Sequence, residues 1–221
     1  MSRLNHLKSK WLSLTIESLR INDGVANRWF STLESYYTPT PVRCYHNFNH
    51  IDELLTLHDR YAPVLKTPNI CQLAIWFHDV VYDPTKHDNE DKSIEMFKSF
   101  AEESHLDGVT VDRVSEYIDA TKHHTKIPTT NTDQDYFLDM DISILGREPN
   151  VYLEYSKNIR KEYIHVPEQQ YRVGRSLILE KFKELGESLY KTNEFKRLYA
   201  KNAVDNLQSE IDRLSDESQP I

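Results

Sequence analysis

The chain has 221 residues, of which 38% are hydrophobic and 28% charged, and its formal net charge is −8. This length suits one well-buried domain and is short for two enzyme domains. The negative charge argues against a dedicated nucleic-acid surface, because such surfaces gather Lys and Arg to neutralise phosphates.

The spacing of apolar residues predicts an all-α fold. Apolar side chains recur at intervals of three and four, and five glycines and nine prolines are few for a β-sandwich or a doubly wound sheet. We expect helices at about 2–21, 24–37, 47–60, 68–82, 89–105, 110–124, 133–146, 149–164, 167–186 and 193–214. One domain should span 1–214, with a core at about 25–146 and C-terminal helices at about 149–214, followed by a disordered tail at 215–221.

Cellular location follows from what the sequence lacks. Only two cysteines are present, no apolar stretch approaches the length of a membrane span, and the N-terminus has no hydrophobic segment with a cleavage site. These features favour a cytoplasmic protein without a membrane partner. The first or the last helix is amphipathic enough to form a homodimer contact.

The most informative residues are His50, the adjacent pair His78-Asp79, and Asp141, which together form an H…HD…D pattern. His78-Asp79 lies in an apolar run, where an unpaired carboxylate would cost several kcal/mol to desolvate. A bound divalent cation would remove that cost. Each residue alone has an ordinary alternative: a hydrogen-bonded core histidine, a buried His-Asp pair, or a carboxylate at a helix end.

Helical projection tests whether these candidates face inward. His50 falls in the apolar stripe of its helix, and Asp141 falls in that of its own, whereas Asp139 points away from the stripe. His46 lies at the edge of the first stripe. Imidazole and carboxylate ligands suit Mn, Fe, Co, Zn or Mg, with one or two ions per chain.

Further site residues are predicted from polar groups near apolar faces. His124 flanks the core side of its helix while His123 points nearly opposite, so His124 is a candidate for a second metal, a substrate phosphate or proton transfer. Its alternative is a histidine bound to terminal carbonyls. Lys122 either holds a phosphate oxygen or is solvated, and Glu90 either orients the attacking water or complements a helix dipole.

Two arginines and a tyrosine complete the candidate set as substrate-binding residues. Arg175 lies on an apolar face and needs an anion there, either a substrate phosphate or a structural carboxylate such as Glu154 or Glu162. Arg160 is a weaker case of the same kind. Tyr82 is either a pocket wall or a core aromatic.

Seven segments occur in an order that resembles a known family: Tyr45–Ile51, Trp76–Asp83, Asp88–Glu90, Thr121–His124, Leu138–Gly146, Ile159–Tyr163 and Gly174-Arg175. They are similar to YHNxxHI, WFHDVVYD, DNE, TKHH, LDxDxxILG, IRxEY and GR in a predicted phosphohydrolase group of the HD superfamily, over residues 25–210. The resemblance implies an HD-type helical bundle. It also implies a metal held by His50, His78, Asp79 and Asp141, and hydrolysis of a phosphoester or phosphoanhydride.

The mechanism expected from these roles is attack of a metal-activated water on a small phosphorylated substrate, such as a nucleotide-like molecule. Asp79 would both bind the metal and orient the water. Lys122, Arg175 and His124 would neutralise the charge that develops on the phosphate. Two alternatives are a di-iron HD-type oxygenase and a metal-containing binding or regulatory module without catalysis.

Overall fold

The all-α fold class is confirmed by a computed structural model that describes residues 2–124, 132–216 and 218. Ten α-helices and five short 3₁₀ or π-helical turns occur in this described part, which contains no β-strand. Extended pairing there is restricted to a single bridge between Thr40 and Arg43. None of the described helices has the length and apolar character needed to cross a membrane.

The chain divides into two compact units. The first contains Met1–Pro39 and His46–Lys122, and the second contains Thr40–Tyr45 and His123–Ile221. The boundary between the units falls inside the core segment expected at 25–146, because the residues from His123 onward belong to the second unit. Each unit is described separately below.

The first unit holds the helices α1 to α6. Their bounds, with those of the short turns, are α1 Arg3–Leu12, η1 Ser13–Ser18, α2 Asp23–Tyr37, α3 Phe48–Tyr61, η2 Ala62–Val64, α4 Pro68–Phe77, α5 Asn89–Glu103, α6 Gly108–Ala120 and η3 Thr121–His123. The helix expected at 2–21 becomes π-helical after Leu12 and ends at Ser18, and the helix expected at 110–124 becomes 3₁₀ after Ala120.

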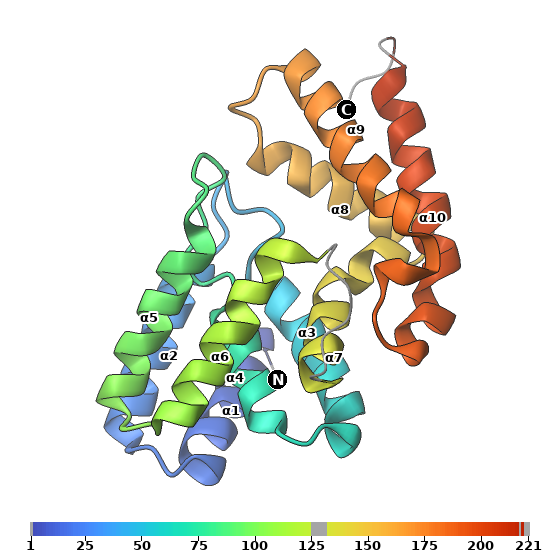
Figure 1. The fold of residues 1–221 in the computed structure, drawn as a ribbon. Helices are drawn as coiled ribbons and strands as arrows, with labels where there is room; N and C mark the ends of the chain where they lie inside the picture. The colour runs from blue at the N-terminus through green and yellow to red at the C-terminus, as the bar shows by residue number, and fades with distance from the viewer. Residues whose placement is uncertain (1, 125–131, 217, 219–221) are drawn as a thin grey trace. The chain divides into compact units, whose positions relative to one another are not determined.

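Helix α4 forms the centre of the first unit and contacts α3, α5 and α6 (Figure 1). Pro68 begins the helix, where its missing N–H leaves no hydrogen bond unmade. Almost every later side chain of α4 is buried, including Trp76 and Phe77. Trp76 and Phe77 both contact Trp11 of α1, so the aromatic core surrounds the end of α4.

The second unit is built around its C-terminal helix. Its elements are α7 Thr132–Asp141, η4 Ile142–Gly146, α8 Pro149–Glu162, α9 Glu168–Leu185, η5 Gly186–Leu189 and α10 Asn193–Ser215. Helix α10 contacts α8, α9, η4 and η5, and Figure 1 shows it alongside α9. Ser215 is helical, while residues 217 and 219–221 of the expected tail lie outside the described residues.

Gly146 ends the Leu138–Gly146 segment at a point where α10 passes very close. A Cβ atom at this position would lie 2.4 Å from the backbone oxygen of Tyr199 and 2.5 Å from its Cβ atom. Because real Cβ atoms do not approach backbone so closely, only glycine fits here. This glycine therefore allows the packing of η4 against α10.

Candidate metal centre

Three of the predicted metal ligands meet in the first unit. His50 Nε2 lies 3.2 Å from His78 Nε2 and 3.7 Å from Asp79 Oδ2. The distance from His78 Nε2 to Asp79 Oδ2 is 3.1 Å. The side chains of His50 and His78 are 2% and 1% exposed, and that of Asp79 is 21% exposed. The cluster is therefore buried on its imidazole side and reached by solvent at its carboxylate.

These separations fit a shared cation. Metal–ligand bonds of about 2.0–2.2 Å at tetrahedral angles place neighbouring ligand atoms about 3.3–3.6 Å apart. The three atoms offered by His50, His78 and Asp79 all lie within 4.8 Å of one another. Two imidazole nitrogens and one carboxylate oxygen form a donor set that suits Zn, Mn, Fe or Co.

The orientation of His78 is set by the last turn of α4. Its Nδ1 atom lies 2.9 Å from the carbonyl oxygen of Ile75, which can only accept a hydrogen bond. Nδ1 therefore carries the proton, and in the neutral imidazole Nε2 presents its lone pair toward His50 and Asp79. Helix α4 ends at Phe77, earlier than the expected residue 82, so the His-Asp pair occupies the turn that follows.

His50 is placed by the start of α3. Asn47 is the N-cap residue of this helix, and its side-chain oxygen accepts a hydrogen bond from the backbone N–H of Asn49 at 2.8 Å. The cap fixes the first turn, from which His50 projects into the core. Asparagine before an apolar periodic segment is a helix-start signal, so this role of Asn47 could have been predicted from the sequence.

The segment after His78-Asp79 is held by the first turns of α5. Ser93 Oγ accepts a hydrogen bond from the Val81 backbone N–H at 3.1 Å. The amide of Asn89 both accepts from the Asp83 N–H at 3.0 Å and donates to the Asp83 carbonyl at 2.9 Å. Asn89 thus fixes the end of the Trp76–Asp83 segment through two hydrogen bonds to the Asp83 backbone, a role that was not predicted from the sequence.

His46 and Tyr82 lie beside the cluster as a stacked pair. Their ring centroids are 4.2 Å apart with an interplanar angle of 27°, and the His46 and His50 centroids are 6.1 Å apart. Tyr82, predicted as a wall of the substrate site, is therefore next to a histidine that lies four residues before His50, just ahead of α3. Both rings are partly exposed.

The fourth predicted ligand, Asp141, belongs to the second unit. It lies at the end of α7, and its Oδ2 atom is 3.0 Å from His124 Nε2. The two side chains are 14% and 13% exposed, respectively. His123 is exposed, as predicted, although the helix before it ends at Ala120. His124 thus contacts one of the four H…HD…D residues.

The projection of Asp139 away from the core was wrong. Its side chain is fully buried, and its carboxylate accepts hydrogen bonds at 2.7 Å from the backbone N–H groups of Lys191 and Thr192 and from the Thr192 hydroxyl. A projection assumes that one face of a helix is exposed. In α7 every residue from Asp133 to Met140 is buried, so the assumption fails.

The predicted catalytic residues Lys122 and Glu90 occupy different settings. Lys122 Nζ lies 2.5 Å from Asp91 and 2.8 Å from Asp119, and its hydrogen bonds to these two carboxylates raise its pKa well above the usual range. Its charge is therefore already compensated. Glu90 lies in the first turn of α5 and is half-buried.

The anionic partner of Arg175 is Glu210 of α10. Arg175 Nε and the terminal nitrogen Nη2 lie 2.9 and 3.4 Å from the two carboxylate oxygens, and both side chains are almost entirely buried. Tyr152 also donates a hydrogen bond to Glu210. This carboxylate was not among those named from the sequence, Glu154 and Glu162, but the pairing supports the structural alternative for Arg175.

Arg160 and Glu162 stabilise backbone around α8. Arg160 Nη1 donates to the carbonyls of Tyr163 and Val166 at 2.8 and 3.3 Å, which closes the turn between α8 and α9. Glu162 accepts a hydrogen bond from the Tyr45 N–H at 2.7 Å. The Ile159–Tyr163 segment therefore holds backbone in place through Arg160 and Glu162.

Comparison of the chain with protein-family models, with curated proteins and with solved structures gave no match.

Proposed function

We propose that this chain is a metal-dependent phosphohydrolase whose divalent cation is bound by His50, His78 and Asp79. The observation that carries the proposal is the convergence of these three ligand atoms at 3.1–3.7 Å in the first unit. The H…HD…D pattern and the resemblance to HD phosphohydrolases support the choice of reaction. Asp141 stays a ligand predicted from the pattern.

The donor set fits catalysis better than a structural role. Structural zinc sites are usually closed by four protein ligands rich in thiolate, whereas catalytic sites combine three protein ligands with an open position. Here the donors are imidazole and carboxylate, and Asp79 is the most exposed of the three. The open side of such a site would lie at this carboxylate.

Each residue has a distinct part in the proposed reaction. A divalent cation in this position would polarise a phosphoryl oxygen and lower the pKa of a bound water. His78 is kept in the ligating tautomer by its hydrogen bond to Ile75. Asp79 would contribute one oxygen to the metal and hold the attacking water with the other. The stacked ring of Tyr82 would form one side of the substrate site.

The test is metal content together with phosphate release. His50→Gln and Asp79→Ala should each lose most of the bound metal and all metal-dependent phosphate release, measured by elemental analysis and a phosphate assay over a panel of phosphoesters and phosphoanhydrides. His58→Gln is the matched control, because His58 is a buried histidine on the same helix that bonds the Pro68 carbonyl instead. The control should keep its metal.

The outcome also separates the competing functions. Full metal content in His50→Gln would refute the metal centre itself. A metal-loaded protein that consumes oxygen but releases no phosphate would refute hydrolysis in favour of a di-iron oxygenase. Metal binding without either reaction would make the chain a binding module. Asp141→Asn, measured in the same way, tests the fourth ligand predicted from the sequence.

A further inference from the structure

A small cavity lies between α8, α9 and α10 of the second unit. Its volume is about 30 Å³, and the residues used below, Lys157, Arg160, Tyr171, Glu210 and Arg213, all line it. A cavity needs about 10–15 Å³ of such space to hold one water molecule, so this one has room for a water-sized group. It can therefore hold one oxygen atom of a ligand whose remainder lies outside.

Three cations surround this cavity without a carboxylate partner in the described residues. Arg160 donates to two backbone carbonyls and lies 4.7 Å from the centroid of the Tyr171 ring. Arg213 donates to the Ser156 hydroxyl at 3.2 Å. Lys157 is exposed and makes no ion pair with the described residues. On a chain with a net charge of −8, three such cations at one cavity are unexpected.

The carboxylate that lines the cavity does not neutralise them. Glu210 is paired with Arg175 at 2.9 Å and accepts a hydrogen bond from Tyr152. Its charge is therefore compensated within the core. The charges of Lys157, Arg160 and Arg213 stay positive in sum, which attracts an anion to the mouth of the cavity.

A second observation concerns a residue that lines the cavity. The Oη atom of Tyr171 is buried and has no hydrogen-bond partner in the described part of the chain. Buried polar atoms of native proteins are generally hydrogen-bonded, to protein groups or to bound molecules. A ligand oxygen in the cavity beside Tyr171 would satisfy this hydroxyl.

We propose that this cavity is a binding site for a phosphate-type oxyanion, with one oxygen inserted beside Tyr171 and the charge held by Lys157, Arg160 and Arg213. The site is built only from residues of the second unit, and the proposal does not depend on the His50-His78-Asp79 cluster. Its ligand is either free inorganic phosphate or the phosphate group of a small phosphomonoester. Both present the same tetrahedral oxygens, so the cations would recognise either.

The first experiment measures binding of inorganic phosphate to the full chain after treatment with a chelator, which removes metal-dependent binding elsewhere. Calorimetry and thermal melting should show a saturable rise in stability with phosphate, because a ligand of the folded state shifts unfolding by mass action. Sodium chloride at matched ionic strength should not reproduce it. A parallel titration with glycerol phosphate distinguishes the two ligand sources. If glycerol phosphate binds more tightly than inorganic phosphate, the site is assigned to a phosphomonoester. If the two bind equally, the site is assigned to free phosphate.

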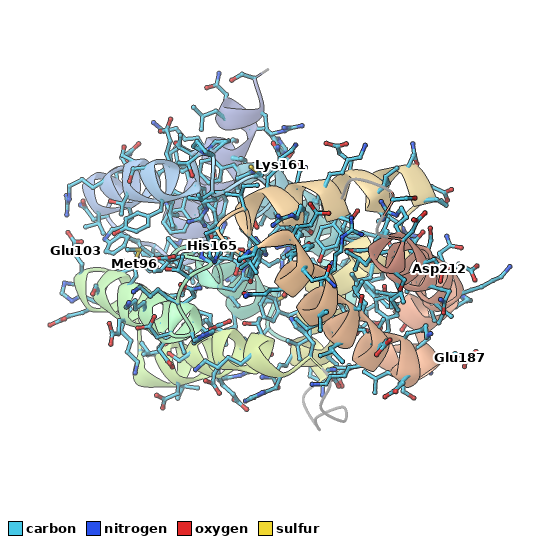
Figure 2. All side chains as sticks on the ribbon, turned by 90° about the horizontal axis from the view of Figure 1, so that it is seen from above. Met96, Glu103, Lys161, His165, Glu187 and Asp212 are labelled. Carbon is cyan, nitrogen blue, oxygen red and sulfur yellow. The ribbon has the colours of Figure 1, made fainter. Side chains whose placement is uncertain are left out.

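The second experiment assigns the binding to this cavity. Lys157→Gln and Arg213→Gln should each weaken phosphate binding about 10-fold, the effect of losing one charged hydrogen bond. Lys161→Gln is the matched control, and Lys161 is labelled in Figure 2. It follows Lys157 by four residues on α8, and its amino group donates to the Asn158 side chain instead. This variant should bind phosphate like the wild type.

Tyr171→Phe separates phosphate binding by the Tyr171 hydroxyl from a purely structural role of this hydroxyl. The variant should bind phosphate several-fold more weakly while melting no lower than the wild type in phosphate-free buffer, because it removes a buried hydroxyl that lacks a partner. The proposal is overturned if phosphate does not bind saturably, which would mean that the cavity holds water only. It is also overturned if Lys157→Gln and Arg213→Gln bind phosphate as tightly as Lys161→Gln.

Discussion

The buried carboxylate of Asp139 gives the folded protein a measurable pH dependence of stability. Burial raises its pKa to about 6, even though hydrogen bonds from Lys191 and Thr192 oppose the shift. The reference value for an exposed aspartate is 3.8. Because the folded state binds this proton more tightly than the unfolded state, the stabilisation is complete below about pH 4 and disappears as the pH rises through about 6.

The size of the effect follows from the two pKa values. The full difference corresponds to about 3 kcal/mol, and between pH 7 and pH 5 the free energy of unfolding should gain about 1.3 kcal/mol from this group. Asp139→Asn removes the titrating proton and keeps one acceptor oxygen. The free energy of unfolding of the wild type, minus that of the variant, should therefore grow by about 1.3 kcal/mol as the pH falls from 7 to 5.

Urea unfolding of both proteins at pH 7, 6 and 5 measures this difference. Asp205→Asn, on the exposed face of α10, controls for the loss of one negative charge. A difference between wild type and Asp139→Asn that stays constant across this range, or shrinks toward pH 5, would refute the assignment of a raised pKa to Asp139. Measuring a difference is necessary because other groups titrate in the same window.

Three further outcomes are expected. Burial lowers the pKa of His58, so the stability that the neutral imidazole gives to the folded state is present above about pH 6.5 and is lost as the pH falls. Between pH 7 and pH 5, the free energy of unfolding measured in urea should therefore fall less for His58→Gln than for the wild type. Arg175→Ala should cost about 3–5 kcal/mol in urea unfolding because it leaves Glu210 buried and unpaired, whereas adding Glu210→Leu should recover much of this loss. His124→Ala should lower phosphate release about 10²-fold if it acts in proton transfer or phosphate binding, while His123→Ala, on an exposed residue, should stay near the wild type.

Helix starts could be predicted from the sequence better than helix ends. Pro68 and Pro149 begin α4 and α8 at the expected residues, because proline fixes the backbone for the first helical position. The end of α4 at Phe77 was placed at 82. The apolar run continues to Val81, and Val80 is fully buried without being helical, so apolar periodicity cannot mark this end.

The site residues that could be predicted are those that lie within short, recognisable sequence segments. His50 and the pair His78-Asp79 were identified from short segments, and the structure brings these three side chains together. The partner of Arg175 was missed because Glu210 is 35 residues away on another helix. Pairing of such distant residues depends on helix packing, which a single sequence does not encode in any local pattern.

The chemical difference between the metal cluster and the other buried charges lies in which atoms face one another. The carboxylate of Asp139 faces hydrogen-bond donors, so its contacts are complementary without any ligand. In the cluster, a neutral His78 whose Nδ1 proton is donated to Ile75 presents a lone pair at Nε2, toward the Asp79 Oδ2 atom, which also carries lone pairs. A proton on His50 Nε2 can point well toward only one of these two atoms, whereas a cation at the centre meets all three. Metal content in His50→Gln, rather than stability, is therefore the measurement that decides the role of this cluster.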